Sequence, residues 1–187
     1  MRFWGRVFMF LCIGATWLTG AWQSGAQLPY ELSADKSLTL PDVTEYRTWP
    51  FMGTSLVPDD KNNNKAIFPG IHTVYINPSA LETRREKGVF PDGTIILMEN
   101  FHVEVKEAES GYGYFTTGGM DLLAAIKDRR QFSGSGWGYY AFFDRDLKAG
   151  KKVVPLQAPA KCQSCHTVGA ADDEVFTQYY PSLKRNP

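Results

Sequence analysis

One run of sequence decides the fold class: Thr94-Ile95-Ile96-Leu97-Met98-Glu99-Asn100-Phe101-His102-Val103-Glu104-Val105-Lys106. This is the longest apolar-rich stretch of the chain with the character of a β-strand. In its second half the residue types alternate, as expected for side chains that point to opposite faces of a sheet. Glu99, Phe101, Val103 and Val105 would share one face, and Asn100, His102, Glu104 and Lys106 the other. The run predicts a long β-strand.

Further strands are expected on both sides of this run. Ile71–Ile76 is rich in β-branched and aromatic residues, and Asn77-Pro78 would end it. The segment 120–129 fits a helix about as well as a buried strand, because its apolar residues match both patterns. Other expected strands are 49–57, 112–117 and 137–143, and short helices are expected near Pro41 and over 78–87 and 172–180.

The order of these elements predicts an α+β fold, a mainly antiparallel β-sheet with a few peripheral helices. The whole chain carries 20 basic and 20 acidic residues. Without Arg2 and Arg6, 18 basic residues would face 20 acidic ones, a net charge of −2. Nothing in this balance suggests nucleic acid as a partner.

The first 26 residues have the features of a secretory signal peptide. Arg2 and Arg6 precede a short apolar core, and Ser24-Gly25-Ala26 offers small residues for cleavage. The apolar run, Val7 to Leu18, falls short of the roughly 20 residues that span a bilayer. We expect an exported, periplasmic protein whose residues 27–187 form a single domain, with an uncleaved N-terminal anchor as the alternative.

Near the C-terminus, Cys162-Gln163-Ser164-Cys165-His166 has the C-x-x-C-H pattern of c-type haem attachment. Two thiols at this spacing can add across the two vinyl groups of one porphyrin, and His166 is then placed to bind the iron. Zinc, a redox pair or a disulfide would also suit C-x-x-C alone. A four-cysteine zinc site is excluded because the mature chain has no other cysteine. We therefore expect one covalent haem c, held on the C-terminal segment by Cys162 and Cys165 with His166 on the iron.

The axial position opposite His166 would decide the function. A strong sixth ligand makes an electron carrier, and an open position makes a site that binds and converts small molecules. Glu99 is a further candidate, because a carboxylate buried beside a haem would serve as a proton-transfer base. The alternative is that Glu99 faces solvent or a loop donor. The candidates for the sixth ligand are His72, His102, Met52, Met98 and Met120.

Several motifs together resemble the cytochrome P-460 family, which includes the cytochromes called c′-beta. The resemblance runs from about residue 41 to residue 183. It rests on Phe68–Pro78, Gly88–Thr94, Lys127-Asp128, Trp137–Tyr139, Cys162–His166 and Val175–Leu183. It implies a small antiparallel β fold, a homodimer and a five-coordinate c-type haem.

The enzymes of the family oxidise hydroxylamine, and the c′-beta members instead bind gases such as nitric oxide in a phenylalanine-capped pocket. The enzymes join a lysine covalently to the haem edge, and this sequence has His72 at the aligned position. Their proton-handling carboxylate corresponds to Glu99.

Three functions follow from the resemblance and the motif. The first is a haem oxidoreductase acting on hydroxylamine, nitric oxide or peroxide, with Glu99 and His72 as catalytic candidates and a redox partner protein. The second is a nitric oxide binding protein, in which Phe68 or Phe101 would crowd the iron. The third is an electron carrier with His72 or His102 as sixth ligand.

Overall fold

The computed structural model describes Met1 and residues 30–183, so the expected signal peptide lies outside the described residues. Its centre is a five-stranded antiparallel sheet in the order β2-β3-β4-β5-β6. Neighbours in space are neighbours in sequence, and β4 and β5 are joined by a tight turn, whereas longer loops or α2 connect the other pairs. The strands are β2 (Phe51–Val57), β3 (Gly70–Ile76), β4 (Ile95–Ala108), β5 (Gly111–Lys127) and β6 (Trp137–Phe142).

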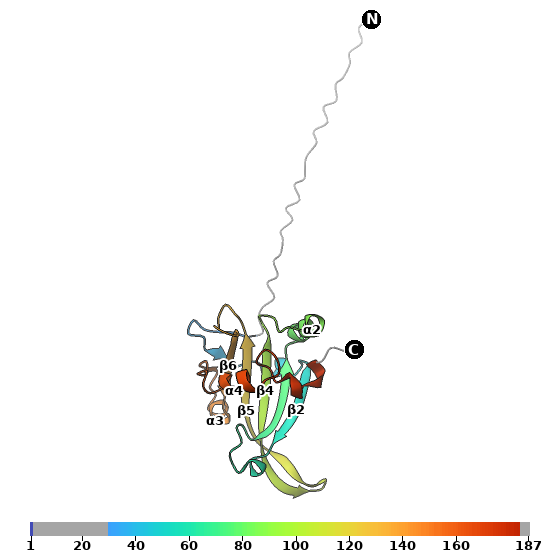
Figure 1. The fold of residues 1–187 in the computed structure, drawn as a ribbon, viewed down its shortest axis with the longest axis vertical. Coiled ribbons are helices and arrows are strands. Elements are labelled where there is room, and N and C mark those ends of the chain that lie inside the picture. The colour runs from blue at the N-terminus through green and yellow to red at the C-terminus, as the bar shows by residue number, and fades with distance from the viewer. Residues whose placement is uncertain (2–29, 184–187) are drawn as a thin grey trace.

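The run quoted above forms β4, the middle strand. Its partner β5 is one continuous strand, so segment 120–129, which suited helix and strand equally, is largely strand. The strand is favoured over a helix because pairing with β4 buries every second residue of the segment, namely Leu122, Ala124 and Ile126. The outer halves of β4 and β5 form an arm that extends beyond the rest of the sheet (Figure 1). The pairing slips between Phe101 and Val103, where the arm begins.

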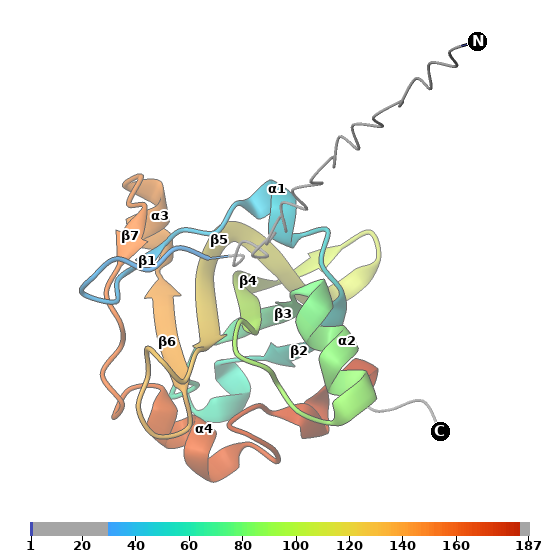
Figure 2. The ribbon, with the colours of Figure 1, turned by 90° about the horizontal axis from the view of Figure 1, so that it is seen from above.

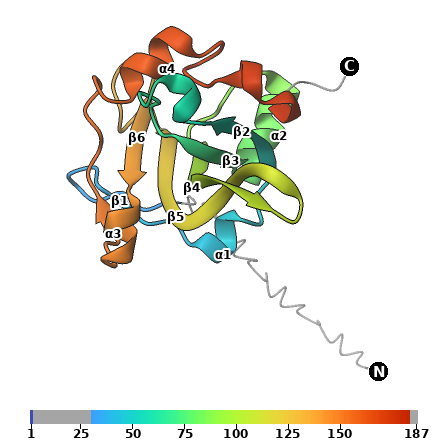
Figure 3. The ribbon, with the colours of Figure 1, turned by 90° about the horizontal axis from the view of Figure 1, so that it is seen from below.

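Segments that lie outside the five strands in the sequence cover the two faces of the sheet (Figures 2 and 3). The N-terminal face is covered by residues 30–49 and by the segment after β6. This cover contains β1 (Leu38–Thr39), α1 (Val43–Tyr46), α3 (Asp144–Lys148) and β7 (Val153–Val154), and β1 pairs with β7. The core on this face includes Leu38, Tyr46, Trp49, Ile95, Leu97, Leu122, Ala124, Ile126, Tyr140 and Phe142.

The C-terminal face is covered by residues 162–183, which run across it from β6 toward β2 (Figure 3). This cover contains α4 (Gln163–Gly169) and two short 3₁₀ helices, η2 (Thr177–Tyr179) and η3 (Pro181–Leu183). The core on this face includes Met52, Val74, Ile76, Ala80, Leu81, Phe90, Trp137, Tyr139, Val175 and Leu183.

The expected helix over 172–180 is wrong. Asp173 and Glu174 have φ values of 48° and 57°, in the left-handed region that a right-handed helix excludes. Their carboxylates bind other elements instead of lying along a first helical turn, and only η2 within this range is helical.

The helix expected over 78–87 is confirmed as α2 (Pro78–Lys87). Pro78 stands at the first helical position, where its missing N–H costs nothing. Gly88 ends the helix with a φ of 74°, a left-handed conformation that glycine adopts freely. The remaining 3₁₀ turn, η1 (Asp60–Asn62), lies in the loop before β3. Among the described residues, no helix is long and apolar enough to cross a membrane. The expected α+β fold is confirmed.

Candidate haem site

The C-x-x-C-H segment lies on the C-terminal face beside β6. Cys162 precedes α4 and packs, half-buried, against the core of that face, and Cys165 is exposed on the helix. Both thiols are free of disulfides. Burial raises the pKa of the Cys162 thiol above its usual range. The two cysteines are therefore both available for covalent attachment.

His166 is held on both sides of its ring. Its imidazole packs against Tyr139, with ring centroids 4.5 Å apart, and against Phe176, at 4.8 Å. Its Nδ1 lies 2.7 Å from the carbonyl oxygen of Glu174. A carbonyl only accepts, so Nδ1 must carry the proton and Nε2 keeps its lone pair. Burial also lowers the pKa of His166, which favours the neutral form that binds metals.

The C-terminal face has an apolar stretch that the protein itself covers only in part. On the N-terminal face, Leu97 and Leu122 are at most 2% exposed. Their sequence neighbours Met98 and Leu123, which are paired across β4 and β5 on the opposite face, are only half-buried. Ile96 and Ala125, the next pair along, are also half-buried. A large flat apolar group would cover such a surface, so these residues fit a haem.

One step further along the strands the same face becomes polar. Asn100 and Asp121 pair across β4 and β5, roughly 7 Å from Met98 and Leu123 at two residues of strand rise. Both are buried, and Asn100 Nδ2 donates to Asp121 Oδ2 at 3.2 Å. His102 Nε2 lies 3.0 Å from the same oxygen. The Oδ1 atom of Asn100 is buried without a hydrogen-bond partner.

This polar group borders a cavity of about 550 Å³ between the loop before β3 and the arm of β4 and β5. Phe68 lies at its edge with a φ of 56°. Three carboxylates and no basic side chain except His102 border it. The full lining is Asp59, Asp60, Asn64, Phe68, Pro69, Asn100, His102, Val103, Val105, Tyr114 and Asp121.

His72 shares the polar row, since it pairs with Asn100 across β3 and β4. Its ring nitrogens are both engaged. Nε2 lies 2.7 Å from the carbonyl oxygen of Phe68, and Nδ1 lies 3.4 Å from Ser55 Oγ. Because the carbonyl only accepts, Nε2 carries the proton and has no free lone pair for iron. His72 is thus brought to the expected face, and in this arrangement it holds the Phe68 loop.

Glu99 lies on the N-terminal face, opposite to the one that carries Cys162 and His166. It is 1% exposed, and its Oε1 accepts from Tyr46 Oη at 2.8 Å. Arg47 Nη2 lies 2.6 Å from the same oxygen. Glu99 is thus buried against donors from α1 and the residue that follows it, and the sheet separates it from the attachment motif. Its role as a base at the haem stays a prediction that this geometry does not support.

The remaining sequence candidates divide between the two faces. Met98 packs against the core of the C-terminal face, and Met52 is buried in that core. Met120 packs against the core of the other face. Phe101 does not border the cavity, whereas Phe68 does.

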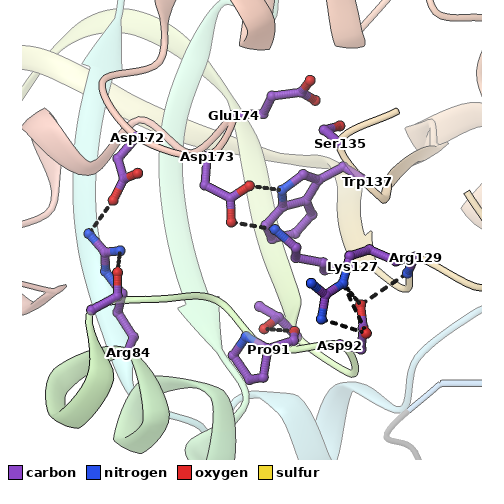
Figure 4. A network of polar contacts seen from close by, with 12 residues as sticks. Arg84, Pro91, Asp92, Lys127, Arg129, Ser135, Trp137, Asp172, Asp173 and Glu174 are labelled. Atoms are coloured by element: carbon purple, nitrogen blue, oxygen red, sulfur yellow. Dashed lines mark hydrogen bonds and ion pairs between the residues drawn. The ribbon is translucent and has the colours of Figure 1, made fainter. Parts of the chain in front are cut away.

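A network of charged groups binds the C-terminal cover to the sheet (Figure 4). The sequence motifs did not predict this network. Asp172 binds Arg84 of α2, Asp173 binds Lys127 of β5 and Glu174 binds Tyr139 of β6. The only signal in the sequence is the run of three acids, which we interpreted as the first turn of a helix.

The cytochrome P460 family model matches residues 43–177. The chain belongs to the cytochrome P460 family. The family implies a haem cofactor and its iron, in agreement with the C-x-x-C-H segment and the half-covered apolar face. No curated protein matches the chain.

Proposed function

We propose that this cytochrome P460 is an exported mono-haem protein that oxidises or reduces small nitrogen species such as hydroxylamine or nitric oxide. One haem c would be attached through Cys162 and Cys165, with His166 as its axial ligand and Met98 and Leu123 against its apolar edge. The haem supplies reversible one-electron chemistry at an iron with an open coordination position. Export to the periplasm, a homodimeric state and a redox partner protein belong to the same proposal.

The observation that carries the proposal is the order of groups along one face of the sheet. His166 packs on Tyr139, which pairs with Ala125 on β5. The apolar pair Met98 and Leu123 follows along the strands, and then the polar pair Asn100 and Asp121, which borders the cavity. A small polar molecule can approach from that cavity on the side away from His166. Because oxidation of hydroxylamine releases protons as well as electrons, the His102–Asp121 pair is our candidate for the proton acceptor.

A nitric oxide binding protein is the second candidate function, and the position of Phe68 favours it. This phenyl ring borders the cavity, and the His72 hydrogen bond fixes the loop that carries it. An aromatic side chain there would favour small uncharged ligands. An electron carrier is less well supported, because His72 Nε2 and His102 Nε2 both have hydrogen-bond partners within the protein.

Turnover of hydroxylamine by the haem-loaded protein, with an artificial electron acceptor, tests the proposal. We expect measurable turnover that falls at least roughly tenfold in Asp121→Asn, the range associated with loss of acid–base assistance. Asp146→Asn is the matched control, since Asp146 pairs with Lys151 and does not line the cavity. Nitric oxide binding without any turnover would establish the binding protein instead. A protein without bound haem would overturn both functions.

A further inference from the structure

The acidic loop Asp172-Asp173-Glu174 contacts the axial histidine and also α2, β5 and β6. Figure 4 shows its ion pairs with Arg84 and Lys127. Glu174 acts through two groups. Its carbonyl accepts from His166 Nδ1, and its carboxylate accepts from Tyr139 Oη at 2.9 Å and from Thr167 Oγ1 at 3.1 Å. The same residue therefore binds the axial imidazole, strand β6 beneath it and the residue that follows the histidine in α4.

The backbone that presents this carbonyl is in an unfavourable conformation. Asp173 and Glu174 both have positive φ values, a backbone conformation that is strained for residues other than glycine. Such a conformation persists only where the surroundings impose it. Here the contacts of Asp173 with the sheet hold the backbone in this conformation.

Asp173 is bound to the sheet by a largely buried ion pair. Its carboxylate pairs with Lys127 Nζ, whose side chain is only 8% exposed, and accepts from Trp137 Nε1 at 3.3 Å. The Lys127 ammonium also lies over the Trp137 ring, 5.3 Å from its centroid. Removal of one charge from a buried pair leaves the other unpaired, so these contacts resist displacement of the loop.

We propose that the Lys127–Asp173 ion pair positions the axial histidine, by holding the Glu174 carbonyl where it accepts the hydrogen bond from His166 Nδ1–H. This inference rests on the proposed ligation of haem by His166. A hydrogen bond from the outer imidazole nitrogen raises the basicity of the coordinating one. The ion pair thereby controls how strongly His166 donates to the iron, although neither Lys127 nor Asp173 touches it.

The test compares Lys127→Met with Lys148→Met in the haem-loaded protein. Lys148 pairs with Asp144 at 2.6 Å on α3, so the control makes the same substitution and breaks an ion pair on another element. The first readout is solvent exchange of the His166 Nδ1 proton, followed by NMR. We expect exchange at least tenfold faster in Lys127→Met and unchanged in Lys148→Met.

The second readout is the reduction potential, and its sign separates two effects. Loss of a positive charge near the iron favours the ferric state and lowers the potential. Loss of the imidazole hydrogen bond weakens donation and raises it. We expect a rise in Lys127→Met, of up to about tenfold in the equilibrium constant or about 59 mV for one electron. A fall in potential with unchanged proton exchange would overturn the inference.

A double variant separates an effect on the position of His166 from a general loss of stability. Lys127→Met with Asp173→Asn removes both charges, so no buried charge is left unpaired. We expect it to be more stable than Lys127→Met but to keep the faster proton exchange. Recovery of wild-type exchange in this variant would show that the ion pair acts on stability alone. A wild-type protein whose haem is not ligated by His166 would overturn the proposed function and this inference together. A protein whose haem is ligated by His166, but whose proton exchange does not respond to Lys127→Met, would overturn this inference alone.

Discussion

Glu99 shows how the surroundings of one side chain decide its role. Its carboxylate is almost fully buried, and it accepts from Tyr46 Oη and from the Arg47 guanidinium, both carried by α1 or its end. A buried carboxylate is tolerated only when its oxygens are paired in this way. The pairing joins the N-terminal cover to the middle strand, so Glu99 has a structural task on its own face of the sheet.

Glu99→Gln is expected to lower the free energy of unfolding by about 1–3 kcal/mol, the usual range for loss of a charge-assisted hydrogen bond. Arg47 is half-exposed and can turn to water, which keeps the cost at this level. Denaturant unfolding measures the change, and the absorption spectrum of the haem should not move. A loss of hydroxylamine turnover with no loss of stability would instead support the role of Glu99 as a base.

Alternation along the quoted run correctly predicts that Glu99 and Asn100 point to opposite faces. It does not say which face carries the haem, because that depends on where residues 162–183 fold back on the sheet. The family alignment pointed to Glu99, whereas the structure places Asn100, His102 and Asp121 on the face of the attachment motif. Asp121 lay in the segment of ambiguous secondary structure, so sequence periodicity could not assign its side chain to a face.

Among the elements, the junction between the η1 loop and β3 depends on one glycine. Gly70 has a φ of 144°, and a Cβ there would lie 2.3 Å from the carbonyl oxygen of Phe101 and 2.5 Å from Asn100 Oδ1. Gly70→Ala should therefore destabilise the protein by about 3 kcal/mol, from backbone strain and overpacking together. It should also disturb the cavity through Asn100.

The unfolding midpoint in denaturant and the affinity of the ferric protein for a small anionic ligand such as cyanide measure these two effects. Gly88→Ala is the control, because its φ is also positive but nothing lies within 4 Å of the added methyl group. Equal stability losses in the two variants would contradict the close approach at Gly70.

The 172–180 segment explains why one predicted element failed. Three acids before apolar residues are typical of a helix start, because carboxylates favour the N-terminal end of the helix dipole. Here each carboxylate binds a partner that lies far away in sequence, namely Arg84, Lys127 and Tyr139. Local pattern cannot reveal such partners, and tertiary contacts override the helical preference of the segment.

In the molecule as a whole, tyrosines buried on both faces of the sheet make the free energy of unfolding depend on pH. Burial raises the pKa of Tyr30 to about 12, and it raises the pKa values of Tyr46, Tyr139 and Tyr140. Unfolded tyrosine ionises near pH 10, at roughly its unperturbed pKa. The folded state therefore keeps protons that the unfolded state loses, and this contribution to stability is present below about pH 10 and lost above it.

We expect the free energy of unfolding to fall as the pH rises past about 10, with tyrosinate absorbance appearing together with unfolding. Parallel titrations of absorbance and of circular dichroism measure both changes. Full tyrosine ionisation in a protein that keeps its native circular dichroism would contradict the burial.

We infer that His166 binds the haem iron from one side and that the cavity at Asn100 and Asp121 leaves the other side open. The absorption spectrum of the purified ferrous protein at neutral pH tests it most directly. A high-spin spectrum that changes on addition of nitric oxide is the predicted result. A low-spin, six-coordinate spectrum that is indifferent to nitric oxide would contradict the claim.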